Sequence, residues 1–185
     1  VRRDHYRWYR DLDFPYLGIT ANVDVTGVMR AHQTHGEPLF AGMLHRIMGA
    51  ANHVPELRQR IRVEDGRDTV VEHERVHPGF TVAGADGLFN FAMVEQHDDR
   101  ARFCEEVAEA ARRKADATTL TPFEGQRDDL LFCSCLPWLD FTHVTHPVPL
   151  QRVDTIPRIA WGRVVPDGDG HRCAVNLQAH HALVD

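Results

Sequence analysis

The residues with the clearest chemical potential lie near the carboxyl end, where His180 and His181 are followed by Asp185. The preceding residues 172–180 alternate between polar and apolar side chains, which predicts a β-strand. This alternation places His181 in line with the apolar face of the strand, together with Cys173, Val175, Leu177 and Ala179. It places His180 on the opposite, more polar face, so His181 is the histidine we expect on the buried side.

An imidazole at a strand end is suited to proton transfer, because its ordinary pKa lies near neutral pH. A partly buried His181 could meet a substrate with little competition from water. Spacing alone leaves another interpretation open, since the chain holds 13 histidines and H-x-x-x-D arises easily by chance. A hydrogen-bonded structural histidine would explain the pattern more simply.

Metal chemistry finds little support in the sequence. The four cysteines, Cys104, Cys133, Cys135 and Cys173, form no C-x-x-C pair. Two histidine pairs have i, i+3 spacing but no acidic or cysteine partner nearby; they are His32 with His35 and His143 with His146. We interpret these as surface histidines and expect no bound metal.

Composition limits the classes of partner. The chain has 185 residues, of which 43% are hydrophobic, and this fits one domain with a substantial core. Its formal net charge of −6 makes it a poor general partner for nucleic acid or an anionic membrane. No apolar run is long enough to span a bilayer and no signal peptide is visible, so we expect a cytoplasmic protein.

Both helices and strands are expected along the chain. Residues 38–52 have helical spacing of apolar side chains, and Pro38 suits a first turn. A helix capped by Asp98 should run to about Asp116, with acidic residues early and basic residues late. A short helix is expected over residues 2–12.

Strands are predicted at residues 17–25, 70–71, 80–83, 88–94, 130–136, 158–165 and 172–180, with a break at Pro78 and a turn at 166–170. Strands from distant parts of the chain flank isolated helices. This favours an α+β fold, a two-layer sandwich in which helices pack on a mixed β-sheet, over a regular βαβ repeat.

Five segments resemble the chloramphenicol acetyltransferase family in order and spacing. They are Gln178–Asp185 (family Q-x-H-H-A-x-x-D), Val1–Tyr6 (R-[RK]-E-H-F), Pro55–Arg58 (P-E-F-R or D-E-L-R), Val76–Val82 (V-x-P-x-[FY]-T-V) and Ser134–Phe141 (S-A-x-P-W-x-x-F). Each is short, but together they span essentially the whole chain. The resemblance implies the chloramphenicol acetyltransferase-like version of the sandwich.

The resemblance also implies a mechanism. The second histidine of the pair, His181, would take the proton from a substrate hydroxyl as its oxygen attacks the thioester of acetyl-CoA. Ser134 would stabilise the resulting oxyanion. Asp185 would pair with Arg2 and order the site, and neither a metal nor a covalent enzyme intermediate would be required. Without the resemblance, Ser134 would be a core hydrogen-bonding residue, and Asp185 and Arg2 would be surface charges.

Further roles follow from the same resemblance. Trp138 and Arg163 would lie near acetyl-CoA, although a core tryptophan and an exposed arginine are the plainer interpretations. Trp8, Tyr9 and Tyr16 would contact the acceptor. Family members are homotrimers with active sites between subunits, so the resemblance implies a homotrimer, a cytoplasmic enzyme and antibiotic resistance.

The sequence departs from the family at three points. Ala160 replaces a threonine that helps hold a water near the transition state, which predicts slower chemistry or a different acceptor geometry. Residues 13–17 do not match the family's L-P-C-x-F, so the acceptor could be a small alcohol related to chloramphenicol. Residues 1–185 form a single domain that we expect to lack the family's first strand and last helix.

Two other interpretations stay open. One is an acyltransferase of the dihydrolipoyl type, which shares the fold and an H-x-x-x-D-G motif; Arg2, the segment Ser134–Trp138 and the absence of a lipoyl domain argue against it. The other is a degenerate trimer that binds a ligand without turning it over, which Ala160 suggests. Peptide-synthetase condensation domains need roughly twice this length.

Overall fold

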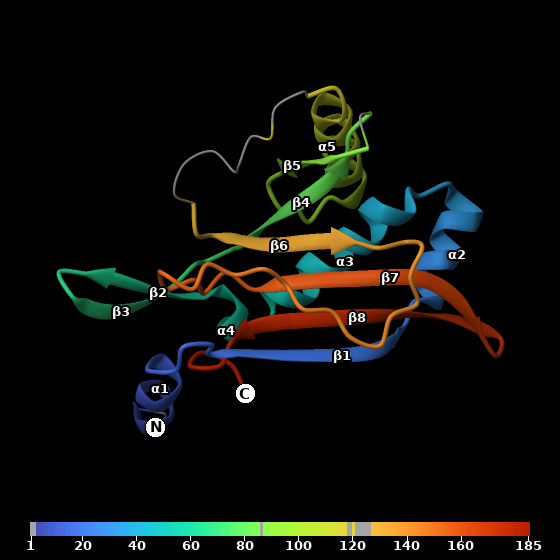
Figure 1. Cartoon of the computed structure of the whole chain (residues 1–185). Helices are drawn as coiled ribbons and strands as arrows, with labels where there is room; N and C mark the ends of the chain where they lie inside the picture. Colours follow the sequence, from blue (N-terminus) through green and yellow to red (C-terminus); the bar gives the residue numbers. More distant parts are fainter. Residues whose placement is uncertain (1–2, 86, 118–119, 121–126) are drawn as a thin grey trace.

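The computed structural model describes residues 3–85, 87–117, 120 and 127–185. A six-stranded mixed sheet lies at its centre, in the order β1-β8-β7-β6-β4-β5 (Figure 1). Strand β6 runs parallel to both β4 and β7, whereas the other neighbours are antiparallel. The strands are β1 (Tyr16–Asp24), β4 (His77–Ala83), β5 (Phe89–Met93), β6 (Leu130–Cys135), β7 (Arg158–Asp167) and β8 (Gly170–His180). The expected α+β sandwich with a mixed sheet is confirmed.

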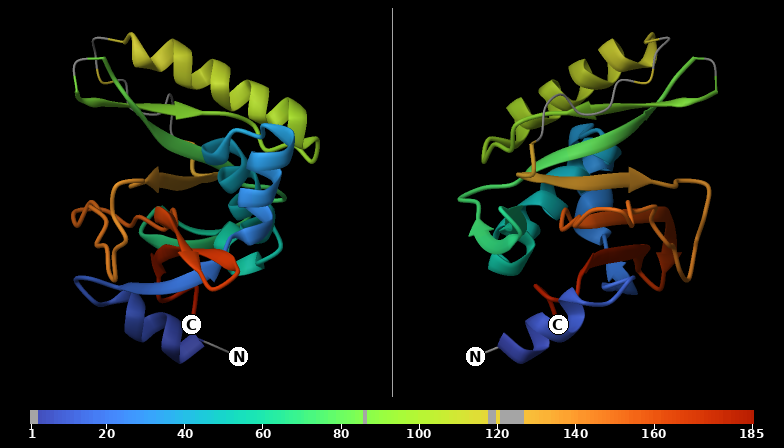
Figure 2. Two further views of the ribbon diagram at one scale, coloured as in Figure 1. Left: turned by 90° about the vertical axis from the view of Figure 1, so that its right-hand side faces the viewer. Right: turned by 60° about the vertical axis from the view of Figure 1, so that its left-hand side comes forward.

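Three helices cover one face of this sheet; they are α2 (Thr26–His35), α3 (Leu39–Asn52) and α5 (Arg100–Ala115) (Figure 2). Helix α3 begins directly after Pro38, as the sequence predicts. Its Met43, Leu44 and Met48 are buried in the main core, where Phe103 of α5 joins them. The helix face is therefore an apolar layer built at helical spacing.

An irregular loop, residues 136–157, passes across part of the other face, over β7 and β8 (Figure 1). Its contacts with the sheet include hydrogen bonds from His146 N to Gln178 Oε1 (3.2 Å) and from Tyr16 Oη to the Asp154 carbonyl (2.9 Å). The polar side chains of β8 are consequently buried, with exposed fractions of 0% for Asn176, 4% for Gln178 and 3% for His180. The prediction that His181 is the buried histidine of the pair is wrong, because this loop covers the polar face.

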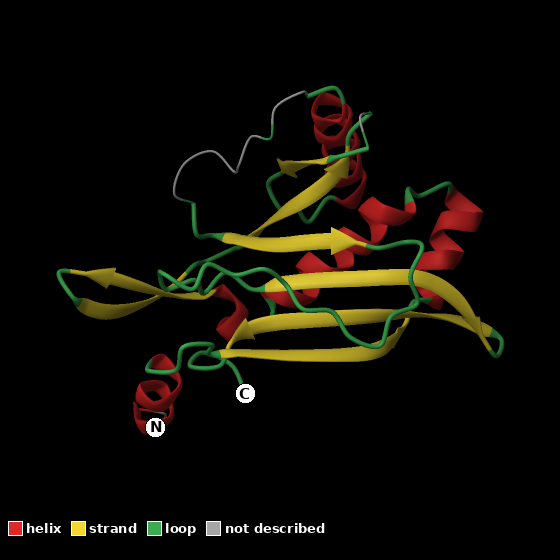
Figure 3. Ribbon diagram, viewed as in Figure 1, coloured by secondary structure: helices red, strands yellow, loops and turns green. Residues whose placement is uncertain are grey.

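Helix α1 (Arg3–Arg10) and the hairpin of β2 (Gln59–Glu64) and β3 (Arg67–Glu72) lie at one end of the sheet (Figure 3). Asp68 of the hairpin accepts hydrogen bonds from Tyr6 Oη (2.8 Å) and Arg10 Nε (2.7 Å). These contacts fix the helix beside the hairpin. The short helix α4 (Pro55–Arg58) leads directly into β2.

A buried guanidinium ties the hairpin to the sheet. Arg60 is 1% exposed and donates to the carbonyls of Asp128 (2.6 Å), Leu130 (2.6 Å) and Leu57 (3.0 Å). Burial lowers the pKa of Arg60 to about 10. Its carbonyl partners satisfy the donors that burial removes from water, so β2 is held against the start of β6.

Several elements differ from the sequence expectation. Strand β4 continues through Pro78, where its only paired neighbour is β6. His77 N donates to Asp129 O on that side, so the proline nitrogen faces the unpaired side and no ladder bond is lost. The cap of α5 is Asp99 rather than Asp98, since Asp99 Oδ1 accepts from Arg102 N at 3.1 Å.

Helix α2 and strand β2 were not predicted from the sequence, and only residues 70–71 of β3 were predicted. The hairpin turn contains Asp65 and Gly66, which have φ angles of 51° and 72°. An Asp-Gly pair with positive φ is a strong signal for a tight hairpin, so this element was predictable. Strand β5 lies at the sheet edge, and its Phe89 is exposed. No helix among the described residues is long and apolar enough to cross a membrane.

Candidate active site

His181 lies in the turn that follows β8. Its backbone N–H donates to the Pro15 carbonyl at 2.7 Å, and its ring stacks on Tyr9 with centroids 3.8 Å apart. Its Nδ1 lies 2.7 Å from the Val184 carbonyl. A carbonyl oxygen can only accept, so Nδ1 carries the proton, and in the neutral ring Nε2 carries the lone pair. The turn thus presents His181 in the tautomer that a general base needs.

His180 has a different role from its neighbour. Its Nδ1 accepts from Ala182 N at 3.2 Å, and its carbonyl accepts from Leu183 N at 2.9 Å. Burial, assisted by the nearby Arg10 cation, lowers the pKa of His180 to about 4. The ring is therefore neutral at physiological pH and serves to close the turn that holds His181.

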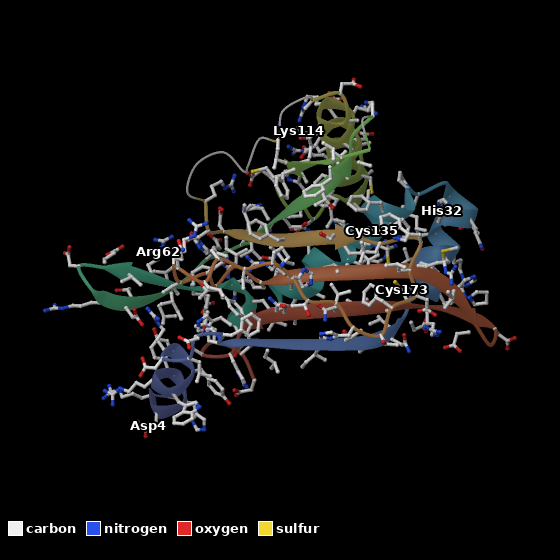
Figure 4. All side chains as sticks on the ribbon, viewed as in Figure 1. Asp4, His32, Arg62, Lys114, Cys135 and Cys173 are labelled. Carbon is white, nitrogen blue, oxygen red and sulfur yellow. The ribbon has the colours of Figure 1, made fainter. Side chains whose placement is uncertain are left out.

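Ser134 lies on β6, where a gap opens in the sheet. Pairing between β4 and β6 ends at Phe80 and Cys133, whereas pairing between β6 and β7 continues to Cys135 and Trp161. Strand β4 turns away from β6 beyond this point, and Cys135 marks the carboxyl end of β6 (Figures 1 and 4). The hydroxyl of Ser134 therefore sits where the sheet splits.

A cavity of about 1180 Å³ occupies this region and is lined by Ser134. On the helix side its walls include Met29, Phe40, Met43 and Trp161. On the loop side they include Phe89, Phe91, Trp138, His146 and Arg158. Pockets for small ligands usually measure about 300–1,000 Å³, so this mostly apolar cavity has room for more than one small molecule.

Trp138 and Arg163, the residues expected near acetyl-CoA, both line this cavity. The Trp138 side chain is 66% exposed, and Arg163 is also exposed. The Arg163 backbone N–H donates to Leu139 O at 2.7 Å, which ties the start of the 136–157 loop to β7. A hydrophobic ring and a cation thus share this wall of the cavity.

The residues expected to contact the acceptor lie elsewhere in the chain. Tyr9 stacks on His181, while Trp8 is 70% exposed beside it on α1. Tyr16 lines a separate hollow of about 220 Å³ together with His180. Tyr9 and Tyr16 therefore lie near the histidine pair, and none of the three aromatic residues lines the cavity at Ser134.

Within one chain His181 and Ser134 are far apart. The register aligns Ser134 with Ala160 and Ala160 with Asn176. His181 comes five residues after Asn176, which is roughly 17 Å along a strand. His181 does not line the cavity at Ser134. Arg2 lies outside the described residues, so its expected pairing with Asp185 stays a prediction; Asp185 is exposed.

Two polar residues at the cavity were not predicted from the sequence. His146, which we expected at the surface, is half-buried and its Nε2 lies 2.9 Å from Asn176 Oδ1. That expectation is wrong because the 136–157 loop folds back onto β8. Arg158 was also missed; it is buried, its Nη2 donates to Asp154 Oδ2 at 2.7 Å, and its guanidinium lies over the Phe132 ring. Arg158 is a charged residue at the start of the apolar strand predicted at residues 158–165. Its position was the signal from which it could have been found.

Comparisons with known proteins agree with this architecture. The family model for chloramphenicol acetyltransferase matches residues 1–185. Chloramphenicol acetyltransferase 3 of Escherichia coli is 25% identical over 186 residues, covering 100% of this chain and 85% of that protein. A chloramphenicol acetyltransferase of Clostridium perfringens is 22% identical, covering 100% of this chain and 83% of its own.

Solved structures give the same result for the fold. A chloramphenicol acetyltransferase superposes with a TM-score of 0.84 at 21% identity, covering 100% of this chain and 87% of that one. A truncated catalytic core of the 2-oxoacid dehydrogenase multienzyme complex from Thermoplasma acidophilum gives 0.68 at 18% identity, with coverage of 100% and 87%. Because the family model matches the full length of this chain, the chain belongs to the chloramphenicol acetyltransferase family and is an acyltransferase.

Proposed function

We propose that this protein transfers an acetyl group from acetyl-CoA to a hydroxyl of chloramphenicol or a related small alcohol. The family match and the names of the relatives support acetyl transfer to such an acceptor. The higher TM-score for the chloramphenicol acetyltransferase than for the 2-oxoacid dehydrogenase core favours this function over a dihydrolipoyl-type transferase. With chloramphenicol as acceptor, the reaction would confer antibiotic resistance on the host.

The observation that carries the mechanism is the hydrogen bond between His181 Nδ1 and the Val184 carbonyl. Because that bond fixes the tautomer, Nε2 is free to take the proton from the acceptor hydroxyl. The hydroxyl oxygen then forms a bond to the thioester carbonyl carbon. When the carbon–sulfur bond breaks, CoA leaves as the thiolate and takes the proton back from His181.

Ser134 acts on the charge that develops during this attack. Its hydroxyl donates a hydrogen bond to the carbonyl oxygen as that oxygen becomes negative. One such donor typically lowers the barrier by about 3 kcal/mol. The mostly apolar walls of the cavity strengthen this interaction, because fewer water dipoles screen it.

The residues at the cavity fit acetyl-CoA as a co-substrate. Its volume of about 1180 Å³ can hold the pantetheine arm and an acceptor together. Arg163 supplies a cation for the phosphates, and Trp138 supplies an apolar surface for the arm. The aromatic walls on the loop side, among them Phe89 and Phe91, suit the body of the acceptor.

A homotrimer would bring the two halves of the site together. His181 and the Ser134 cavity are separated within one chain, so His181 of one subunit would face the cavity of its neighbour. Trp8, Tyr9 and Tyr16 would then approach the acceptor from the subunit that supplies the base. An ion pair between Asp185 and Arg2 would order the part of that subunit that carries His181.

The test is release of CoA thiol, measured with a thiol-reactive dye, from acetyl-CoA in the presence of chloramphenicol and a panel of other alcohols. Removal of the base in His181→Ala should lower kcat by about 10²–10⁴-fold, the range typical of general base catalysis. His35→Ala, an exposed histidine on α2, should retain the native rate.

Retained turnover in His181→Ala would falsify the role of the base. Silence of the native protein with every alcohol would instead favour a ligand-binding trimer. Sedimentation equilibrium checks the assembly, since a stable active monomer contradicts a site shared between subunits.

A further inference from the structure

His146 places an imidazole in the wall of the same cavity that Ser134 lines. It belongs to the 136–157 loop, and its backbone N–H is held by Gln178 Oε1 at 3.2 Å. Its ring is held separately, by Asn176 at 2.9 Å. Two contacts to β8 therefore fix both the backbone and the ring.

The orientation of Asn176 determines which atom of the His146 ring is the donor. The Asn176 amide nitrogen donates to Thr20 Oγ1 (2.9 Å) and to the Ile19 carbonyl (3.3 Å). Its Oδ1 must therefore be the atom that faces His146 Nε2, and Nε2 must carry the proton. Asn176 is completely buried, so this arrangement has no competition from solvent.

The His146 ring is neutral. Burial lowers the pKa of His146, and the nearby Arg158 cation lowers it further, although the bond to Asn176 acts in the opposite direction. A neutral ring with a proton on Nε2 has its lone pair on Nδ1. No described residue donates a hydrogen bond to that Nδ1, so it is available to a ligand.

The surroundings leave His146 well placed to select the acceptor. Arg158, the cation that lines the same part of the cavity, is already bonded to Asp154 and to the Ile156 carbonyl. Ala160 stands between Ser134 and Asn176 in the sheet register and has no polar side-chain atom. The register partners Ser134, Ala160 and Asn176 lie side by side on β6, β7 and β8. The nearest polar group to Ser134 in this series is therefore Asn176, which is bonded to His146.

We propose that His146 is a specificity-determining residue whose Nδ1 accepts a hydrogen bond from a second donor of the acceptor molecule. The proposal rests on the function proposed above and narrows its substrate class. The preferred acceptors are alcohols with an apolar body and a second hydroxyl or an amide N–H. Alcohols of equal size that lack this donor would leave Nδ1 unpaired and bind more weakly.

The test measures binding by calorimetry without acetyl-CoA, so that its outcome does not depend on turnover. Chloramphenicol, which has two hydroxyls and an amide N–H, is compared with its 1-deoxy and N-methyl analogues. In the native protein one of the two analogues should bind about 10- to 100-fold more weakly than chloramphenicol. In His146→Leu that difference should shrink to less than about twofold, because the apolar side chain cannot accept.

Two further variants separate recognition from structure. His146→Gln keeps an acceptor oxygen and should restore part of the discrimination. His143→Leu changes an exposed histidine of the same loop and should bind all three compounds as the native protein does.

Three results would each overturn the proposal. They are equal discrimination in His146→Leu and the native protein, no preference of the native protein for chloramphenicol over either analogue, and absence of native binding to chloramphenicol. Failure of the thiol-release assay alone would refute the transferase function and leave these binding ratios interpretable.

Discussion

The two faces of the central sheet differ in what covers them. On the helix face, α3 and α5 bury apolar side chains such as Leu44 and Phe103. On the other face, the 136–157 loop lies over Asn176, Gln178 and His180, and it does so with hydrogen bonds. The first arrangement derives stability from apolar burial, which has no strict direction, whereas the second fixes the direction of individual polar atoms.

Because of this difference, the helix face contributes mainly to stability, whereas the loop-covered face contributes mainly to the proposed chemistry. Two of the residues that could act on substrates, Ser134 and His146, line the cavity from the loop-covered face. A change on the helix face should therefore alter stability first. A change near the cavity should alter turnover or selectivity with a smaller effect on stability.

The largest effect on stability is expected from Phe103→Ala. The Phe103 ring is fully buried on α5, so truncation leaves a cavity and should lower the free energy of unfolding by about 3–5 kcal/mol. Urea titration measures this loss. Val63→Ala, at an exposed position of the hairpin, is the control and should change stability by less than about 0.5 kcal/mol. Equal losses for the two variants would contradict the role of apolar burial on the helix face.

Ser134→Ala should show the opposite pattern. The Ser134 hydroxyl is partly buried and hydrogen-bonds to none of the described residues, so its loss should change the unfolding free energy by less than about 1 kcal/mol. Turnover, followed by thiol release, should fall about 10²–10³-fold because the oxyanion loses its donor. Unchanged kcat with a raised KM would instead mean that Ser134 only binds substrate.

A further effect concerns the pH dependence of the free energy of unfolding. The pKa of His180 falls from its ordinary value of 6.5 to about 4 on folding, chiefly through burial. The unfolded chain therefore binds the proton more tightly, and the stability that neutral His180 contributes is lost as pH falls from about 6.5 towards 4. His180→Asn keeps an acceptor for Ala182 N and should flatten this part of the curve. Urea titrations between those pH values compare the slopes, and identical slopes would show that His180 does not titrate there.

Part of this molecule could be predicted because its signals are local. The apolar spacing of residues 38–52 predicted α3, and the turn at 166–170 joins β7 to β8 as expected. The five short motifs predicted the family, which the full-length match confirms. The Asp65–Gly66 turn is an equally local signal for the β2–β3 hairpin.

Other features were beyond sequence reasoning because they depend on contacts between distant segments. Alternation along residues 172–180 predicted two faces correctly but could not show that a loop starting some forty residues earlier buries the polar one. For the same reason His146 was expected at the surface. Its burial is decided by Asn176, thirty residues away along the chain.

The sequence by itself determined the family, the helix over residues 38–52, the turn between β7 and β8, and the identity of the histidine and serine that carry the proposed chemistry. Only the tertiary structure decided the tautomer of His181, the neutral state of His180 and the place of His146 in the cavity wall. Residue types and spacing fix which groups are present. Hydrogen bonds and burial by segments far apart in the chain fix where protons reside and which atoms stay free for a ligand.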